Sequence, residues 1–357
     1  MLYLFIIIIL FLLSLYRFDN YTEKGLLGLI FFVFWILATI RADSIGNDTL
    51  TYKNLFNYIV YYQDIELWKT RYEIAYLILN QIIGFCTDNF TIFLGIVNTF
   101  IYFAYYKFIK DYSKNKMLSS LLFFTLGFWG QTVNVIRLQL AIAMMLYAYF
   151  SKSKGNNIWA VVYSILAVLF HRLAWIYLIF WVIPKNVNRR FYFFATSLGM
   201  IVFALFPLFL PLTAKYFPYF QTYVFSNTYQ LDDFKLASLL NFFSRLLIFS
   251  SSLFVFYNNR QQKDYEDFTQ YINISFISLI ILFISFRFNL LDRAADFFWV
   301  FSLILVPQTL DWLKNKNQKV FYFLIVVMFC IAHFSIINIY RPNWNNIYPY
   351  VTIFDEN

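Results

Sequence analysis

The chain has 357 residues, of which 61% are hydrophobic and only 13% are charged, against about 25% charged residues in an ordinary soluble domain. Aromatic residues make up 24% of the chain, and the mean hydropathy is +0.61. These values exclude a soluble globular protein, a disordered chain and a disulfide scaffold, and they leave a polytopic membrane protein. The two cysteines, Cys86 and Cys330, lie in apolar stretches and are expected to be small buried residues.

Apolar runs recur along the chain, and a helix needs roughly 20 such residues to cross the hydrocarbon core. The first run is interpreted as a retained span rather than a signal peptide, because no positive segment precedes it and no small-residue cleavage site follows it. The segment 71–86 mixes polar and apolar residues and is predicted to be an amphipathic helix, at the surface or re-entrant. About twelve spans are predicted in a single membrane domain over residues 1–357, at 2–16, 25–40, 90–108, 117–133, 135–150, 157–171, 172–184, 191–210, 238–257, 270–287, 291–310 and 320–340.

The charges of the loops predict the orientation of these spans. By the positive-inside rule the short basic loops are cytoplasmic, so both termini lie outside together with the longer loops 41–70 and 211–237. The natural setting is a bacterial inner membrane, and the net charge of +9 then reflects topology rather than binding to nucleic acid. The short loops hold 16 of the 28 basic residues, at 17–24, 107–116, 152–154, 185–190, 260–263 and 314–319.

Lysine and arginine are divided differently between the two sides. On this topology 12 of the 16 lysines are cytoplasmic, whereas eight of the twelve arginines lie on or near the outer side. A charge at a span end costs a few kcal/mol on insertion scales, so a compensating partner is expected. One interpretation is local pairing of Arg71 with Glu73. In the same way Arg293 would pair with Asp292 or Asp296. The other interpretation is a shared outer site for an anionic ligand, because arginine binds phosphate in bidentate geometry. The eight arginines are Arg41, Arg71, Arg137, Arg172, Arg245, Arg287, Arg293 and Arg341.

The first outer loop follows a span directly and reads RADSIGNDTLTY from Arg41. Its Gly-Asn pair favours a tight turn. Asp48 then has two interpretations, of which one is the cap of a helix that runs from Leu50 to Tyr62. The other is a carboxylate at the membrane surface that orients a sugar hydroxyl or accepts its proton. Glu73, near the start of the amphipathic segment, is a second carboxylate of this kind.

Two further spans carry polar residues at their outer ends. Arg137 and Gln139 open one span and point to different faces, so Gln139 either packs or contacts a ligand. His171 and Arg172 stand at an outer turn between two short apolar runs. His171 is either a packed, hydrogen-bonded residue or a proton carrier or sugar ligand. His333, with no charged neighbour in the last span, is expected to be structural.

The segment from Arg287 to Asp296 joins two spans with almost no loop, and Arg293 shares a helix face with Asp296. The tail from Arg341 to Tyr350 carries Trp and Tyr, which are typical of an interfacial belt and also stack on sugars. P-loop, dinucleotide and zinc motifs are absent from the sequence. Any chemistry is therefore expected at the outer face, without ATP, cofactor or metal.

Taken in chain order, these features resemble the EpsG family of polysaccharide polymerases, which includes Wzy-type O-antigen and capsule polymerases. The resemblance covers most of the chain, and the first outer loop and the His171 region are its most specific parts. The stretch 191–240 carries no family signal. The matching features are Arg41, Gly46 to Thr49, Tyr52, Phe56, Arg71 to Glu73, Arg137 to Gln139, His171, Arg172, Arg287, Arg293 and Tyr348 to Tyr350.

The resemblance implies an all-helical membrane glycosyltransferase, similar to GT-C enzymes, whose active site lies on the outer face. Such enzymes join oligosaccharide repeat units carried on undecaprenyl diphosphate, without a nucleotide sugar. A hydroxyl of the acceptor's terminal sugar attacks the donor's anomeric carbon, and undecaprenyl diphosphate leaves. The expected partners are these lipid-linked oligosaccharides, the lipid bilayer and a chain-length regulator protein.

The residues then take three expected roles. The candidate catalytic residues, in order of preference, are Asp48, Glu73 and His171. The candidate ligands of the diphosphate are Arg41, Arg137, Arg172, Arg287 and Arg293. The candidate sugar-binding residues are Tyr52, Gln139 and Tyr348.

Three alternatives remain open at this point. An O-antigen ligase shares the lipid donor but transfers to lipid A core, typically with a large outer loop, and 211–237 is only moderate in length. A lipid-linked oligosaccharide flippase also has about twelve spans, but it should carry cations mid-membrane and show two related halves. A structural export component is the non-enzymatic alternative. Single repeat units that accumulate on the lipid or core in a deletion strain would identify a polymerase.

Overall fold

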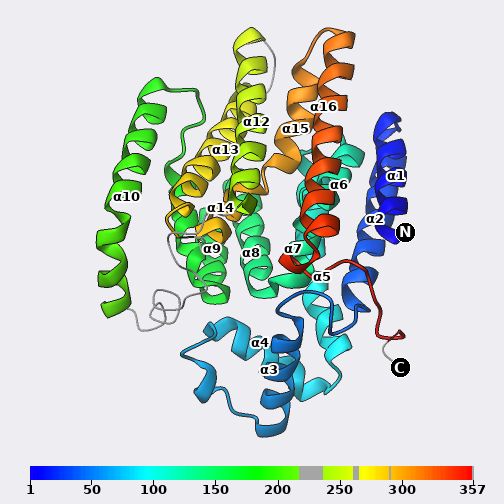
Figure 1. Cartoon of the computed structure of the whole chain (residues 1–357), viewed down its shortest axis with the longest axis vertical. Coiled ribbons are helices and arrows are strands. Elements are labelled where there is room, and N and C mark those ends of the chain that lie inside the picture. The colour runs from blue at the N-terminus through cyan, green and yellow to red at the C-terminus, as the bar shows by residue number, and fades with distance from the viewer. Residues whose placement is uncertain (217–235, 260–264, 289–290, 356–357) are drawn as a thin grey trace. The chain divides into compact units, whose positions relative to one another are not determined.

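The computed structural model describes residues 1–216, 236–259, 265–288 and 291–355, so most of the predicted outer loop 211–237 lies outside the described residues. Within these ranges the chain is all helical, as predicted, with no strand and one isolated backbone bridge (Figure 1). The α-helices are α1 (Leu2–Leu15), α2 (Asn20–Thr39), α3 (Thr49–Tyr62), α4 (Ile74–Cys86), α5 (Phe90–Tyr112), α6 (Lys116–Thr125), α7 (Phe128–Asn134), α8 (Ile136–Ser153), α9 (Asn157–Phe170), α10 (Arg189–Tyr216), α12 (Leu236–Asn258), α13 (Tyr265–Ser285), α14 (Leu291–Trp299), α15 (Ser302–Trp312) and α16 (Lys316–Phe334).

The described helices make the chain a multi-pass membrane protein. Six of them are long and apolar enough to cross a membrane, namely α2, α5, α10, α12, α13 and α16. α14 and α15, bent by 44° at the break between them, form a seventh if the pair is counted as one span. Several shorter apolar helices accompany these, among them α1, α6 and α9. The count of about twelve spans stays a prediction.

Three of the predicted segments have a different helical structure from the continuous helices that were predicted. The predicted span 117–133 is divided into α6 and α7, and Gly127 between them has a left-handed backbone with φ +87°. The predicted run 172–184 is a 3-10 helix, Arg172–Val182. The amphipathic segment 71–86 forms α4, which starts at Ile74 after an extended Glu73. These interruptions bring polar side chains to helix ends, where the candidate residues lie.

The chain folds into two compact units. Unit 1 contains Met1–Trp175 and Lys314–Asn357, and unit 2 contains Ile176–Leu313. The single membrane domain predicted from the sequence therefore contains two units. Most of the candidate residues belong to unit 1, and Arg287 and Arg293 belong to unit 2.

Basic loops gather at one end of unit 1. Lys116, which begins α6, forms an ion pair of 2.8 Å with Glu23 in the first turn of α2. Tyr112, at the end of α5, hydrogen-bonds Ser153 at 2.7 Å. The loops 17–24, 107–116 and 152–154 therefore lie together, and we call this the lysine end. Their common side is what the positive-inside rule predicted for them.

The opposite end of unit 1 holds α3, α4 and the loop after α2 (Figure 1). α2 and α5 run antiparallel, because the indole of Trp35 near the end of α2 donates to the carbonyl of Gly95 near the start of α5, at 3.1 Å. The loop after α2 thus leaves the helix pair at the end away from the lysines. We call this the site end.

The C-terminal tail crosses the loop after α2. The backbone N–H of Ala42 donates to Val351 at 3.0 Å, and that of Gly46 donates to Asn346 at 2.8 Å. Tyr3 of α1 donates its hydroxyl to the carbonyl of Ile347 at 2.5 Å. The tail therefore holds the loop at the site end, and α1 in turn holds the tail.

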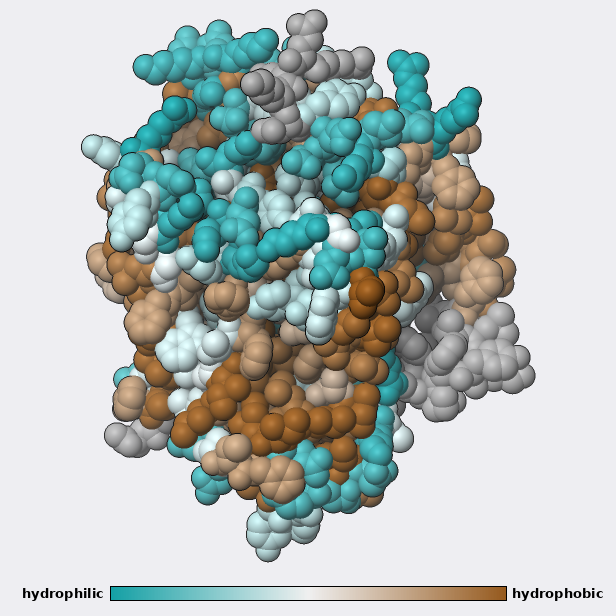
Figure 2. All heavy atoms as spheres, turned by 180° about the vertical axis from the view of Figure 1, so that it is seen from behind, coloured by the Kyte–Doolittle hydropathy of each residue, from teal (hydrophilic) through white to brown (hydrophobic). Residues whose placement is uncertain are grey.

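Apolar side chains cover broad stretches of the surface (Figure 2). Exposed Phe, Leu and Ile residues lie on α1, α9, α10 and α16, where they match a surrounding of lipid. Cys330 is buried as expected, but Cys86 at the end of α4 is exposed, so the expectation of burial was wrong for this residue. α4 leaves several of its apolar residues exposed in the same way, including Ile82 and Phe85.

Candidate active site

Glu73 stands directly before α4 and is only 5% exposed. Both of its carboxylate oxygens accept hydrogen bonds from residues far away in the sequence. Oε2 lies 2.5 Å from Nη1 of Arg137 at the start of α8, and Oε1 accepts the backbone N–H of Arg172 at 3.2 Å. A charge buried without such partners would be costly. Glu73 therefore joins the starts of α4 and α8 to the turn that follows α9.

Arg137 is held on a second side by an aromatic ring. Its guanidinium lies 4.8 Å from the centroid of Tyr72, and that of Arg71 lies 5.5 Å from the same ring. Guanidinium groups are attracted to ring faces, more strongly where water is excluded. The predicted local pair of Arg71 with Glu73 is therefore wrong, since Arg71 contacts the ring and Glu73 pairs with Arg137.

His171 and Arg172 form the turn between α9 and the 3-10 helix. His171 has an extended backbone that ends α9, and its side chain is buried. Its Nδ1 accepts the backbone N–H of Leu173 at 3.3 Å, which favours the neutral form with the proton on Nε2. The guanidinium of Arg172 reaches the carbonyl of Lys69, with Nη2 3.4 Å from the oxygen.

We call Tyr72, Glu73, Arg137, His171 and Arg172 the Glu73 cluster. Three arginines, counting Arg71 at its rim, accompany one carboxylate, so positive charge is in excess. Planar guanidinium groups bind phosphate oxygens in pairs. The cluster therefore suits an anionic ligand, and its carboxylate fixes the guanidinium of Arg137 and the backbone of Arg172.

The loop with Asp48 meets α7 and α8 at the break beside this cluster. The backbone N–H of Asp48 donates to Oδ1 of Asn134, at 3.3 Å. Asn134 ends α7, three residues before Arg137. The Asp48 side chain is half-buried and makes no capping hydrogen bond to α3. Asp48 therefore stands at the N-cap position of α3, as predicted, but its side chain does not cap the helix.

Gly46 shapes this loop. Its φ of +86° is left-handed, and a Cβ there would lie 2.9 Å from the carbonyl oxygen of Val133. Glycine is the residue that accepts both the backbone angle and the close approach. The predicted tight turn is confirmed, and it brings the loop against α7.

Arg41 lies inside unit 1 and is only 1% exposed. Its Nη1 donates to the carbonyl of Ala38, and its Nε lies 3.4 Å from the hydroxyl of Thr49. Burial lowers the pKa of Arg41 to about 10, so the guanidinium stays charged at neutral pH. These contacts favour a role for Arg41 in joining α2 to α3.

The candidate sugar ligands are packed separately. Tyr52 is buried edge-to-face on Tyr76, with ring centroids 5.7 Å apart. Gln139 is fully buried and hydrogen-bonds Tyr105 at 2.7 Å and Gln131 at 3.1 Å. Tyr348 of the tail is half-buried, with its ring centroid 6.1 Å from that of Tyr3. The ring of Tyr76, on which Tyr52 packs, lies in turn 6.3 Å from that of Tyr72 in the Glu73 cluster.

Unit 2 contains its own buried ion pair. Nη2 of Arg245 on α12 lies 2.7 Å from Oδ1 of Asp296 on α14, and Nη1 lies 2.7 Å from the hydroxyl of Ser278 on α13. Asp296 was expected to pair with Arg293, and that pairing is wrong. Sequence reasoning missed this bond, although an arginine within an apolar helix is a signal that a partner exists.

The remaining diphosphate candidates also lie in unit 2. The guanidinium of Arg287 lies 4.5 Å from the ring centroid of Phe203 on α10. Arg293 is half-buried in the first turn of α14. That these two converge with Arg137 and Arg172 stays a prediction.

Comparison with known proteins identifies one family. The model of the EpsG family matches residues 24–352, nearly the whole chain. No curated protein matches the chain. No solved structure matches it either.

Proposed function

The chain belongs to the EpsG family of Wzy-like polysaccharide polymerases, and we propose that it joins oligosaccharide repeat units carried on undecaprenyl diphosphate. The observation that carries the proposal is the Glu73 cluster at the end of unit 1 away from the lysines, in which one buried carboxylate holds the guanidinium of Arg137 and the backbone of Arg172 beside a histidine. The proposed setting is a bacterial inner membrane, with the lysine end in the cytoplasm and the site end toward the periplasm. About twelve spans in a GT-C-like arrangement belong to the same proposal.

The proposed reaction is a glycosyl transfer between two lipid-linked chains. A hydroxyl oxygen of the acceptor sugar forms a bond to the anomeric carbon of the donor. The bond from that carbon to the diphosphate oxygen breaks, and undecaprenyl diphosphate leaves with the electron pair. The hydroxyl proton passes to a base, for which Asp48 is the first candidate because its carboxylate is not used as a cap.

The arginines would act on the leaving group. Arg137 and Arg172, with Arg71 at the rim, present fixed positive charge that stabilises the diphosphate as negative charge grows on its oxygen. Arg287 and Arg293 of unit 2 are proposed to join them. Glu73 has both oxygens occupied, which favours a positioning role for it over that of a base. His171 remains the third candidate for the proton.

The test uses the purified full chain in lipid nanodiscs with a lipid-linked repeat unit as the only substrate. A ladder of products is expected from the wild type. Glu73→Gln should lower polymerisation about 30-fold or more, because breaking one partner of a buried, hydrogen-bonded charge pair costs about 2–5 kcal/mol. Glu66→Gln is the matched control, since Glu66 pairs with Lys69 at the surface. The control should polymerise normally.

Arg137→Lys separates folding from function. Lysine can still pair with Glu73, so membrane level and thermal unfolding should stay near wild type. Polymerisation should nevertheless fall about tenfold, because a point charge loses the planar contact that guanidinium makes with phosphate and with Tyr72. Full-length polymer from well-folded variants of both residues would contradict the proposed site. Consumption of donor only when lipid A core is added would identify a ligase, and transport without chain growth would identify a flippase.

A further inference from the structure

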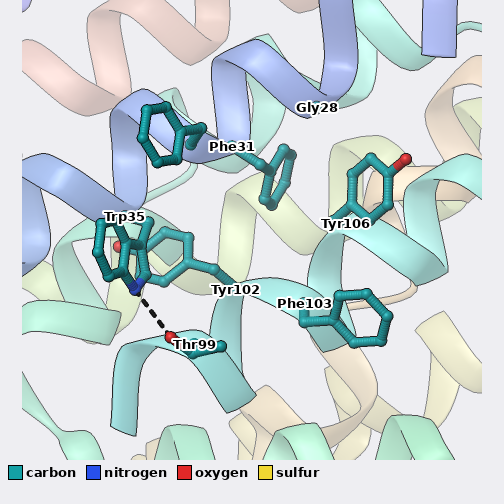
Figure 3. Close-up of a pocket in the computed structure, with 8 residues that line it drawn as sticks. Gly28, Phe31, Trp35, Thr99, Tyr102, Phe103 and Tyr106 are labelled. Atoms are coloured by element: carbon teal, nitrogen blue, oxygen red, sulfur yellow. Dashed lines mark hydrogen bonds between the residues drawn. The ribbon is translucent and has the colours of Figure 1, made fainter. Parts of the chain in front are cut away.

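A groove of about 380 Å³ opens between α2 and α5, a size typical of small-ligand sites (Figure 3). Phe31 and Trp35 of α2 face Tyr102, Phe103 and Tyr106 of α5 across it (Figure 3). The polar atom of the indole is occupied, because Nε1 donates to Oγ1 of Thr99 at 3.1 Å as well as to the carbonyl of Gly95. The walls therefore present mainly aromatic ring surface to whatever lies in the groove.

The place of the groove in the fold identifies the class of its occupant. α2 and α5 are both long and apolar enough to span the membrane, and the groove lies along their middle turns. Its rim is exposed, with Phe32 at 55% and Phe103 at 54%. Apolar surface at this depth is covered by hydrocarbon in a bilayer. The occupant is therefore a hydrocarbon chain.

Gly28 makes room for such a chain. A Cβ at this position would meet only the ring edge of Tyr106, at 3.9 Å, so the missing side chain leaves open space in the wall. The other walls are rigid rings, several of them packed on further rings, such as Phe31 on Phe123 at 5.1 Å. Because its walls are fixed, the groove favours binding of one kind of hydrocarbon chain over the mixed chains of the surrounding lipids.

The two helices that line the groove also connect it to the site end. Tyr102 lines it and shares a hydrogen bond of 2.5 Å with Thr132 of α7, the helix that leads to Asn134 and Arg137. α2 leads from Gly28 directly to the loop with Asp48. A lipid whose headgroup lies at the site end would thus place its chain along these two helices.

We infer that this groove binds part of the polyprenyl chain of the lipid-linked substrate. The inference rests on the proposed function for the choice of a polyprenyl chain over an acyl chain of bulk lipid. Gly28 lies 13 residues before Arg41, which is about 20 Å along α2. A geranyl chain from the site end is too short to reach it, whereas an undecaprenyl chain is long enough.

Two glycines of α2 provide a matched pair of variants. Gly28→Leu places a side chain in the groove, and Gly25→Leu makes the same change one turn earlier, where a Cβ meets nothing within 4 Å. The KM for an undecaprenyl-linked repeat unit should be about tenfold higher for Gly28→Leu than for Gly25→Leu. This is the loss of affinity expected if about two buried methylene groups of the chain are displaced. A geranyl-linked unit should show no such rise. Gly28→Ala, which fits without a clash, should shift KM in the same direction by less.

Direct binding is measured by photolabelling, which does not depend on polymerisation. Undecaprenyl phosphate with a diazirine on its chain should label peptides of α2 and α5, and Gly28→Leu should reduce this labelling while Gly25→Leu should not. Unlabelled undecaprenyl phosphate should compete, and phosphatidylglycerol should not. Equal KM and equal labelling for the two leucine variants, or equal competition by both lipids, would overturn the inference. A wild type that is labelled but builds no polymer would instead count against the proposed function.

Discussion

At the scale of single residues, the two carboxylates at the site end stand in different surroundings. Glu73 is buried, and Arg137 and the Arg172 amide occupy its two oxygens. Asp48 is half-buried, and its backbone N–H, not its carboxylate, holds it to Asn134. A group whose oxygens are all occupied orients its partners, whereas a base must be open to the proton that it accepts. The contrast favours positioning for Glu73 and proton transfer for Asp48.

Substitution of Asp48 tests this assignment. Asp48→Asn keeps the size of the side chain and the hydrogen bond from the backbone N–H to Asn134, but it removes the ability of the side chain to take a proton. We expect normal membrane level and thermal unfolding, and polymerisation reduced by about 10²–10⁴-fold, the usual contribution of general acid–base help. Because no capping bond is present, Asp48→Ala should unfold at nearly the same temperature as the wild type.

Asp43 is the control for Asp48. It lies in the same loop and forms an ion pair with Lys53 at a partly exposed site, where such pairs contribute about 0–1 kcal/mol. Asp43→Asn should therefore polymerise normally. If Asp48→Asn also builds polymer of normal length, the base is another group, and the arginines carry most of the catalysis.

Single residues also show what the sequence allowed us to predict. Gly-Asn before Asp48 predicted the tight turn, because the left-handed angle at Gly46 is a local property. The partners of Glu73 were not predictable in this way. Arg71 is two residues away and was the expected partner, yet its side chain contacts Tyr72, and the ion pair goes to Arg137, 64 residues further on. That choice depends on the tertiary fold, which places the start of α4 beside the start of α8.

At the scale of helices, the start of α2 depends on a charged cap. Oδ2 of Asp19 accepts the backbone N–H groups of Tyr21 and Thr22, at 3.0 and 3.1 Å. The hydrogen bonds from Thr22, of its side chain first and its backbone second, lower the pKa of Asp19 below 3.8. Because the pKa of Asp19 is lower in the folded state than in the unfolded state, the cap stabilises the helix at pH values above the unfolded pKa. That stabilisation is lost as the pH falls through the lower, folded value.

Hydrogen exchange tests this dependence on pH. Corrected for intrinsic rates, the amides of Tyr21 and Thr22 should be protected at about pH 5 and lose protection as the pH falls below 3.8. Asp19→Asn retains a capping oxygen without the charge, so its protection should not change over this range. Parallel behaviour of the wild type and the Asn variant would contradict the assigned cause.

A second helix-scale prediction concerns the loop that Gly46 holds against α7. Gly46→Ala pays for the left-handed angle, about 1–2 kcal/mol, and in addition meets the carbonyl oxygen of Val133 at 2.9 Å. Gly127→Ala is matched to it, because φ is +87° there and nothing lies within 4 Å of the new Cβ. Thermal unfolding should therefore show a larger loss for Gly46→Ala. Equal losses would mean that the loop moves away from α7 freely.

At the scale of the whole molecule, hydropathy predicted most helices but not the breaks within them. The predicted spans 90–108 and 238–257 correspond to α5 and α12, because a long apolar run leaves little choice in a membrane. The break of 117–133 into α6 and α7 occurs at Gly127. Hydropathy does not predict it, because a single glycine in an apolar run can also lie within a continuous helix. The ion pair of Arg245 with Asp296 was missed for a related reason, since it joins helices that are 51 residues apart.

The orientation of the molecule provides the last prediction. The lysine loops lie together at one end of unit 1, and the loop with Asn47 lies at the other. If the lysine end is cytoplasmic, an impermeant maleimide should label Asn47→Cys in intact cells and leave Lys114→Cys unlabelled until the membrane is opened. The background must carry Cys86→Ser, because Cys86 is exposed, whereas Cys330 is buried. Labelling of Lys114→Cys alone would mean that the lysine end faces outward and that the Glu73 cluster faces the cytoplasm. A polymerase that joins lipid-linked units on the outer side would then not meet its substrate.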